Sequence, residues 1–392
     1  MVVAPTAQRL SLQCEGIAAD TTTIRSLDWE RSRFDIEFGL RNGTTYNSFL
    51  VRGERTALID SSHAKFRDSW IPLLKDQVDP ASIDVLIVSH TEPDHSGLIG
   101  DLIDLNPEIE IVGSKVAIQF LQDQVHRPFR SRAVKSGEEL DLGTNPESGV
   151  QHRFEFLSAP NLHWPDTIFS FDHGTGILYT CDAFGLHYCS EELFDSDPGA
   201  IAPDFRFYYD CLMGPNARSV LQALKRMDSL PEINTVAVGH GPLLRHHLSH
   251  WLNDYRDWSG QRSKGESFAA VCYLSQYGFS DRISQAIAHG IGKADAQVQL
   301  VDLRATDPQE LTALVGEAKA VVVPTWPEEP DADVQAAVGT LLAALNPKQL
   351  VGVYDAFGGN DEPIDAVADQ LRSQGQKQAF APLRIRQLPQ GS

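Results

Sequence analysis

A dense cluster of metal-ligand side chains directly follows a buried strand in this 392-residue chain. The mostly apolar run Ile83–Val88 predicts the strand, and the segment Ser89–Gly97 leaves it. The cluster contains His90, Glu92, Asp94 and His95. Pro93 should interrupt regular structure, so we expect a fixed turn whose side chains converge. Imidazoles and carboxylates are the ligands that a divalent metal needs, whereas a solvated polar loop is the alternative. The sequence therefore predicts a metal site at the end of this strand.

Three further candidate ligands lie at the ends of other predicted strands. They are His163, Asp182 and His240. The strands before them are predicted at Phe154–Leu157, Ile177–Thr180 and Thr235–Val238. A single such residue is more often a capping or core residue, but strand ends can assemble one site from distant sequence. Together with the first cluster, these residues supply four imidazoles and three carboxylates, enough for two metals.

The first part of the chain mixes strand-like and helix-like segments. Further strands are predicted at Thr45–Val51, Thr56–Asp60 and Ile168–Phe171. The spacing of apolar residues predicts helices over Lys65–Val78 and Val220–Met227. This mixture fits two sheets flanked by helices. The polar segment 259–266 then predicts a linker, so the first domain should span residues 1–258.

The rest of the chain, residues 267–392, alternates strands with helices, which is typical of a doubly wound parallel sheet. The strands are predicted at Phe268–Leu274, Val298–Val301, Ala318–Val323, Gln349–Val353 and Gln378–Ile385. The helices are predicted at Ser280–His289, Pro308–Val315, Asp331–Leu345 and Asp365–Ser373. The covering helix expected after the last strand is absent from the sequence. We therefore expect this second domain to be truncated at its last helix.

The net charge and the cysteine content limit the possible classes of binding partner and the possible cellular compartment. The chain has 33 Lys and Arg against 53 Asp and Glu, a net charge of −20 that repels nucleic acids and anionic membranes. Met1–Gln13 lacks the pattern of a signal peptide, and no apolar run approaches the roughly 20 residues of a membrane span. The five cysteines lack the paired spacing of a zinc or iron–sulfur site, which predicts free thiols in a reducing compartment. We therefore expect a cytoplasmic protein with no nucleic-acid partner and no membrane span.

The seven candidate ligands resemble the pattern of the metallo-β-lactamase fold, and specifically that of its flavodiiron branch. Hydrolytic members carry His-x-His-x-Asp-His and bind zinc, whereas the second position here is Glu92, as in the flavodiiron family. The surrounding segments His163–Asp166, Asp182–Gly185 and Gly239–Pro242 also match that family. A carboxylate at this position favours iron in its oxidised states. The resemblance implies that His90, Glu92 and His163 hold one iron, that Asp94, His95 and His240 hold the other, and that Asp182 bridges them.

The resemblance covers essentially the whole chain. It implies an α/β architecture in which a metallo-β-lactamase-like αββα sandwich is followed by a flavodoxin-like doubly wound parallel sheet.

Three loops of the second domain are candidates for binding a flavin. The first is rich in small and hydroxyl residues and opens a helix, as a phosphate cradle does, although a turn capped by Ser280 is the alternative. Its residues are Ser275, Gln276, Tyr277, Gly278, Phe279 and Ser280. The other two loops follow strands, where a flavin ring would lie. Their candidate residues are Pro324, Thr325, Trp326, Asp355, Ala356, Phe357, Gly358 and Gly359. This half therefore resembles flavodoxin, and we expect it to bind FMN.

The second loop departs from many relatives because it continues with Pro327–Pro330, two prolines that enclose two glutamates. This composition should stiffen the loop and disfavour an anionic reduced flavin. Trp326 has two interpretations that stay open: it flanks the isoalloxazine ring, or it packs on the surface.

The resemblance implies a flavodiiron oxidoreductase. Electrons would enter through FMN and reduce O2 to water, or NO to N2O, at the di-iron centre. The stretch Phe34–Gly39 resembles forms from oxygenic phototrophs, which carry an additional C-terminal flavin-reductase module that uses NAD(P)H. Those forms are chiefly O2 reductases that provide a photoprotective outlet for electrons. The implied donor is such a flavin-reductase module, ferredoxin or another NAD(P)H-linked protein.

The resemblance also implies an oligomer. The short linker ties the domains end to end, so the flavin and the irons of one chain should stay apart, and relatives solve this with a head-to-tail homodimer. A hetero-oligomer with a paralogue is also compatible. The alternative functions are a zinc-dependent hydrolase fused to a flavodoxin-like module and a non-catalytic partner subunit of a flavodiiron hetero-oligomer. Glu92 disfavours the first, and the complete ligand set disfavours the second.

Overall fold

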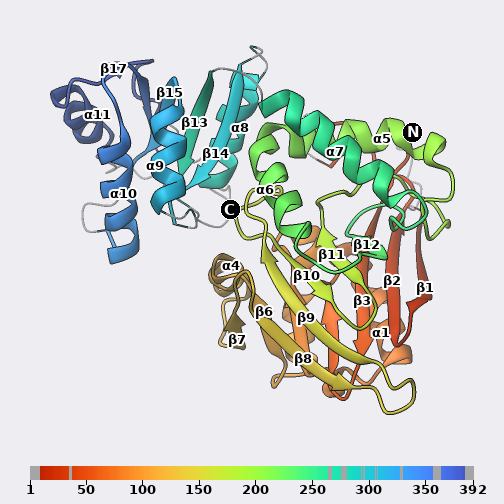
Figure 1. Cartoon of the computed structure of the whole chain (residues 1–392). Helices are drawn as coiled ribbons and strands as arrows, with labels where there is room; N and C mark the ends of the chain where they lie inside the picture. The colour runs from red at the N-terminus through yellow and green to blue at the C-terminus, as the bar shows by residue number, and fades with distance from the viewer. Residues whose placement is uncertain are drawn as a thin grey trace, which may run out of the picture. The chain divides into compact units, whose positions relative to one another are not determined.

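The protein forms two compact units, which a computed structural model describes in detail (Figure 1). The first unit comprises Met1–Met213 and Ser219–Asp257, and the second comprises Gly214–Arg218 and Trp258–Ser392. Within them, the structure describes residues 9–34, 38–263, 267–274, 280–292, 294, 296–304, 306, 308–326, 330–355 and 363–384.

The first unit contains a seven-stranded sheet whose strands follow chain order from β1 to β7. The strands are β1 (Leu10–Ala18), β2 (Thr21–Asp28), β3 (Thr44–Arg52), β4 (Thr56–Ile59), β5 (Val85–Val88), β6 (Glu110–Gly113) and β7 (Arg130–Ala133). The pairs from β1 to β4 are antiparallel, and those from β4 to β7 are parallel. All four residues of β5 are buried, which explains why its sequence is a continuous apolar run.

A second sheet of five strands has the order β12-β11-β10-β9-β8. The strands are β8 (Glu139–Thr144), β9 (Gln151–Ser158), β10 (Ile168–Asp172), β11 (Ile177–Cys181) and β12 (Thr235–Val238). The pairs from β8 to β11 are antiparallel, whereas β11 and β12 run parallel. The carboxyl ends of β9, β11 and β12 therefore lie at the same edge of this sheet.

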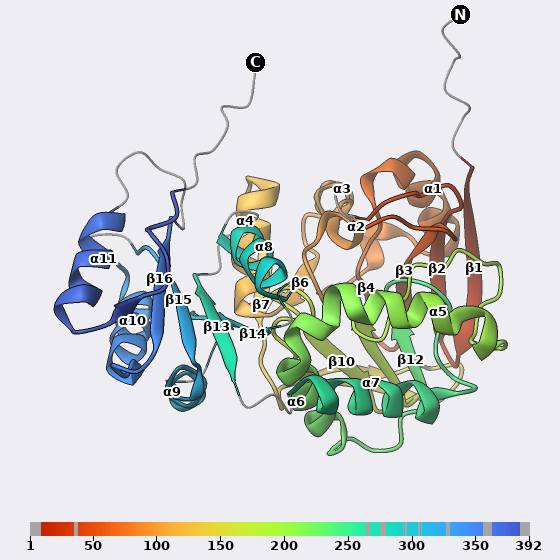
Figure 2. The ribbon, with the colours of Figure 1, turned by 90° about the horizontal axis from the view of Figure 1, so that it is seen from above.

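Helices cover the outer faces of the two sheets. They are α1 (Arg67–Gln77), α2 (Pro93–Ser96), α3 (Ile99–Leu105), α4 (Lys115–Val125), α5 (Pro198–Tyr208), α6 (Ala217–Met227) and α7 (Leu248–Ser263). In Figure 2 the strands lie between α1 and α3 on one side and α7 on the other. Residues such as Leu58, Trp70 and Leu102 form the core between the first sheet and these helices. The αββα sandwich expected for this unit is confirmed.

The second unit contains a five-stranded parallel sheet of order β14-β13-β15-β16-β17. Its strands are β13 (Phe268–Tyr273), β14 (Gln297–Asp302), β15 (Ala320–Pro324), β16 (Leu350–Tyr354) and β17 (Lys377–Gln378). Its helices are α8 (Ser280–Gly292), α9 (Pro308–Glu317), α10 (Ala332–Ala344) and α11 (Ile364–Ser373). Helix α8 packs on one face, and α9, α10 and α11 pack on the other. Numbered from β13, the strand order is 2-1-3-4-5, which is the flavodoxin-like order. Among the described helices of both units, none is long and apolar enough to cross a membrane.

Two segments of the second unit differ from the sequence-based expectation. Residues 259–263 of the expected linker form the end of α7, because Trp251, Tyr255 and Ser259 continue one buried helical face. Residues 264–266 lie outside the described part of the chain. The strand expected over Gln378–Ile385 is shortened to β17, with an isolated bridge between Tyr354 and Leu383 beyond it. The chain bends over residues 379–381, and the pairing resumes where the amide of Leu383 donates to the carbonyl of Val353 over 2.9 Å.

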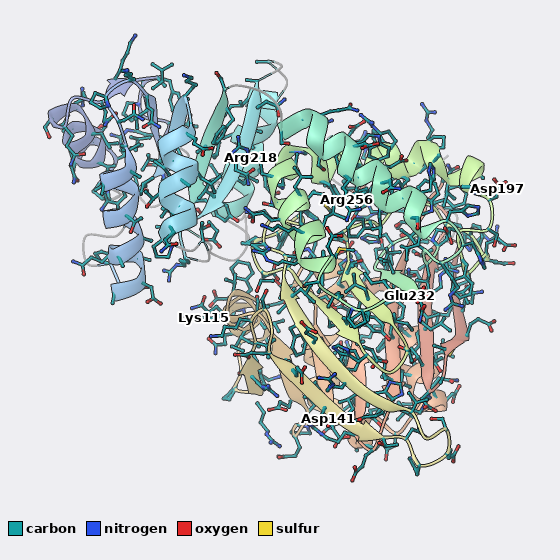
Figure 3. All side chains as sticks on the ribbon, viewed as in Figure 1. Lys115, Asp141, Asp197, Arg218, Glu232 and Arg256 are labelled. Carbon is teal, nitrogen blue, oxygen red and sulfur yellow. The ribbon has the colours of Figure 1, made fainter. Side chains whose placement is uncertain are left out.

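A buried histidine–aspartate pair of the second sheet reaches the turn before β2 in the first sheet. Charged side chains such as Lys115 and Asp141 lie on the outside (Figure 3), but His152 and Asp172 are buried. His152 Nδ1 lies 2.8 Å from Asp172 Oδ2, and His152 Nε2 lies 3.4 Å from Asp20 Oδ2. Burial alone would lower the pKa of His152, but the hydrogen bonds and charges of the two carboxylates outweigh it and raise that pKa. The link between strand β9 and the turn before β2 is therefore strongest when His152 is protonated.

This pair predicts a pH-dependent contribution to stability. Because the pKa of His152 is raised in the folded chain, its contribution is complete below about pH 6.5, the pKa of an unfolded histidine. It is lost as the pH rises through the higher folded pKa. We expect the difference in thermal midpoint between the unmodified chain and His152→Gln to be largest near pH 6 and smaller at pH 9. A difference that grows with pH would contradict the proposed protonation state.

Candidate metal centre

Four of the seven candidate ligands leave the carboxyl end of strand β5. His90 and Glu92 lie in the loop after the strand, while Asp94 and His95 lie on the single-turn helix α2. Regular strand structure ends before Pro93, as expected, and Pro93 is in addition the first residue of α2. A proline is favoured there, since the first helical N–H has no partner within the helix. The short helix holds Asp94 and His95 on one turn next to the loop.

The other three candidates come from the edge of the second sheet. His163 follows β9, Asp182 is the residue after β11, and His240 is the second residue after β12. These are the three strands whose carboxyl ends share one edge. The structure therefore brings together all seven side chains that the sequence singled out, four from the first sheet and three from the second.

Asp182 lies at the middle of the group, and each of its oxygens faces two imidazoles. Asp182 Oδ2 is 3.3 Å from His90 Nε2 and 3.1 Å from His163 Nε2. Asp182 Oδ1 is 2.9 Å from His95 Nε2 and 3.2 Å from His240 Nε2. A carboxylate placed between two pairs of nitrogen ligands has the geometry of a bridge between two cations.

Each half of the group has a carboxylate of its own. Glu92 Oε2 lies 2.9 Å from His163 Nε2 and 3.5 Å from His90 Nε2. In the other half, Asp94 Oδ1 lies 3.5 Å from His95 Nε2 and Asp94 Oδ2 lies 3.5 Å from His240 Nε2. The two halves thus have the same composition, two imidazoles and one terminal carboxylate around a shared Asp182.

The donor set fits two hard or borderline cations. Two of its buried atoms, His90 Nε2 and Asp94 Oδ1, have no hydrogen-bond partner among the described residues. Buried polar atoms without partners are costly unless a bound group completes them. Ligand atoms from His90, Glu92, His163 and Asp182 lie within 4.8 Å of one another, and so do those from Asp94, His95 and His240. Imidazole and carboxylate together suit iron, whereas a site rich in imidazole suits zinc.

The carboxylates and imidazoles of this centre stabilise each other's charged forms. Burial would raise the pKa of Asp182, but the charge of His95 and hydrogen bonds from three histidines hold it well below its usual range. Burial would also lower the pKa values of His95 and His163, yet the neighbouring carboxylates raise both to about 9. Without cations, His90, His95 and His163 therefore carry protons that offset the carboxylates. Cations that bind here must displace those protons.

A second layer of polar groups orients the candidate ligands. His90 Nδ1 donates to Asp166 Oδ1 over 3.0 Å, and Asp166 Oδ2 accepts from the amide of Thr91 over 2.7 Å. His240 Nδ1 donates to the carbonyl of Thr45 over 2.6 Å. These bonds leave the Nε2 atoms of both histidines facing the centre. The sequence showed Asp166 only as part of a matching segment, three residues after His163.

The structure also reveals a buried histidine that sequence reasoning missed. The ring of His187 lies 4.6 Å from that of His240 and 4.9 Å from that of Tyr208, and its Nδ1 is 2.8 Å from Thr44 Oγ1. Burial and the charge of His240 lower the pKa of His187 well below its usual range, so it is neutral. His187 follows no predicted strand, so the signal that identified the other histidines does not apply to it.

The described part of the flavin site lies in the second unit. Ser280 begins α8 directly after the loop that leaves β13; its side chain is buried, and its Oγ has no hydrogen-bond partner among the described residues. Strands β13 and β15 are neighbours where the strand order reverses, and doubly wound sheets bind ligands at this point. An unpartnered hydroxyl at the start of a helix fits a phosphate group.

Other candidate flavin residues lie at the carboxyl ends of β15 and β16 or outside the described part of the chain. Thr325 and Asp355 are buried at the carboxyl ends of β15 and β16, after Pro324 and Tyr354. Trp326 is partly buried and packs against the core of the sheet. The residues outside the described part are Ser275, Gln276, Tyr277, Gly278, Phe279, Pro327, Glu328, Glu329, Ala356, Phe357, Gly358 and Gly359.

Comparisons with known proteins agree with this architecture. The model of the "ODP family beta lactamase" matches residues 44–241. The chain is 54% identical to diflavin flavoprotein A 1 of Synechocystis sp. over 388 residues, which are 99% of this chain and 67% of that relative. It therefore spans about two-thirds of the relative's length. Among solved structures, the metal-soaked Flv1 flavodiiron core of Synechocystis sp. matches with a TM-score of 0.80 and 31% identity, over 97% of this chain and 94% of that one.

Proposed function

The chain belongs to the flavodiiron family of diflavin flavoproteins, and from this membership we propose that it is an oxidoreductase that reduces O2 to water. In this proposal FMN binds in the second unit, and two irons bind at the seven-residue centre of the first unit. The observation that carries the proposal is the placement of Asp182, with one oxygen facing each half of the centre. The zinc-dependent hydrolase is less well supported, because the centre contains three carboxylates.

We assign one iron to His90, Glu92 and His163 and the other to Asp94, His95 and His240, with Asp182 between them. When bound, the irons supply the electrons that reduce the gas, and FMN replenishes them. The protein's part is to hold this donor set rigid and buried. His90 is kept in orientation by Asp166, and His240 by the carbonyl of Thr45. Reduction of one O2 to two H2O consumes four electrons and four protons.

The reduction of O2 needs an electron donor. We propose that this donor is a flavin-reductase module, ferredoxin or an NAD(P)H-linked donor, as the resemblance to the diflavin flavoproteins implies. We further propose a head-to-tail dimer in which each flavin serves the partner's irons, a cytoplasmic location, and a role as a photoprotective electron outlet. NO is the second gas that such a centre can accept, with N2O as its product.

The test is gas consumption by the FMN- and iron-loaded chain, supplied with NADPH and an external flavin reductase. We expect O2 uptake without accumulation of H2O2, because the two irons and the flavin together can deliver four electrons. His90→Ala should reduce uptake to slow oxidation of the flavin, with peroxide as its product. Peroxide formed in step with O2 uptake by the unmodified chain would contradict the proposal. Parallel measurement of NO consumption under argon distinguishes the two gases.

A further inference from the structure

The turn that carries His240 is held mainly by the other sheet. Residues 238–241 are the last residue of β12 and the three that follow it, and side chains from β2 and β3 of the first sheet donate to their carbonyl groups. Gly241 has φ +82°, a conformation that suits glycine, and a Cβ atom there would lie 2.6 Å from the side chain of Leu186. The turn is therefore tight, and its buried carbonyl groups need hydrogen-bond partners.

Asn47, on β3, supplies most of these partners. Its side-chain amide donates both hydrogens, one to the carbonyl of Val238 and one to that of Gly241, each over 2.9 Å. Its backbone amide donates to the carbonyl of Gly239 over 2.8 Å. One fully buried residue thus binds three of the four residues of the turn. Both sides of His240 are fixed in this way.

Two neighbours of Asn47 complete the arrangement. The buried guanidinium of Arg25 donates from Nε to Asn47 Oδ1 over 3.4 Å, which sets the orientation of the amide. Thr45 Oγ1 accepts from the amide of Gly241 over 2.8 Å, and the carbonyl of Thr45 accepts from His240 Nδ1. All of these groups are buried, so water does not substitute for a missing bond.

We propose that Asn47 is a positioning residue for the cation held by Asp94, His95 and His240, and that it acts through the His240 turn alone. The proposal rests on the proposed function, since it presumes that two cations bind. Among the hydrogen bonds of the described residues, those of Asn47 reach the His240 turn and Arg25, and none joins it to Glu92 or His163. Its loss should therefore weaken one of the two sites and spare the other.

The experiment is anaerobic titration of the metal-free full-length chain with Co2+, followed by its visible absorption, and with Fe2+, followed by elemental analysis. The variant is Asn47→Asp, which has the same shape but no hydrogens to donate to the two carbonyls. We expect the unmodified chain to bind two equivalents. In the variant, one equivalent should keep its affinity while the other weakens about 10- to 100-fold, as typical for loss of a residue that orients a ligand. The spectrum of the remaining Co2+ should match that of His240→Ala.

A matched control separates positioning from general loss of stability. Thr23→Val removes one buried hydrogen bond, from Thr23 Oγ1 to the carbonyl of Ser48, on the strand next to β3. It should leave both affinities unchanged. Equal weakening of both cations in Asn47→Asp, or unchanged binding of both, would overturn the inference while the proposed function stands. Fewer than two equivalents in the unmodified chain would overturn the proposed function and this inference with it.

Discussion

Replacing Asp182 with alanine is expected to remove most of both irons from the protein. The carboxylate touches all four imidazoles of the centre, with distances of 2.9 to 3.3 Å from its oxygens to their Nε2 atoms. Its loss removes a ligand from each cation and leaves His95 and His163 without one of the charges that raise their pKa values. Loss of a residue that only orients a ligand weakens metal binding about 10- to 100-fold, so loss of the shared ligand should exceed this. Iron per chain, measured after anaerobic loading and desalting, should fall well below one.

Asp172→Ala is the matched control for this change. Asp172 is also a fully buried aspartate of the second sheet, and it pairs with His152 rather than with the metal centre. This variant should lose thermal stability but keep its iron. Asp182→Ala protein that retained two irons would show that the carboxylate is not their bridge.

Placing a carboxylate at position 280 should abolish FMN binding. Ser280 is buried at the first turn of α8, with a hydroxyl that has no partner among the described residues. In Ser280→Asp the new charge would face the flavin phosphate. At about 4 Å and an effective dielectric constant of about 20, each pair of like charges costs about 4 kcal/mol, roughly a thousandfold in affinity. The purified variant should be colourless. The fluorescence of added FMN should no longer be quenched by the apoprotein.

Ala286→Asp provides the comparison, because it adds the same charge to an exposed position of the same helix. It should bind FMN as the unmodified chain does. If Ser280→Asp kept full flavin content and affinity, the phosphate would have to lie elsewhere, and the doubly wound sheet would lose its assigned cofactor site.

The predictable parts of this protein are those with a local sequence pattern. The run at β5 and the ligands after it are adjacent in sequence, so strand, loop and candidate site could be inferred together. The helix that Pro93 begins is not evident from the sequence, because a proline also interrupts regular structure. The end of α7 is not evident either, because its polar composition conceals the buried spacing of Trp251, Tyr255 and Ser259.

The groups that support the centre had no such pattern. Asn47 and Arg25 lie within ordinary strands, and their importance arises from contacts with residues about 190 to 220 positions away in the chain. His187 lies in an irregular segment and reaches His240 through tertiary packing. Such pairings depend on how two sheets meet, which periodicity within one strand does not encode.

The division of the ligands between the two sheets gives the cations a mechanical role. Each half of the centre combines side chains that follow β5 with side chains from the edge of the second sheet. A bound cation would therefore cross-link the two sheets. Cations that bind only the folded chain also stabilise it by mass action. A related chain without these ligands would thus lose two metal cross-links between its sheets as well as its activity. It could keep this sandwich only by filling the same gap with apolar packing or with a hydrogen-bonded network of its own.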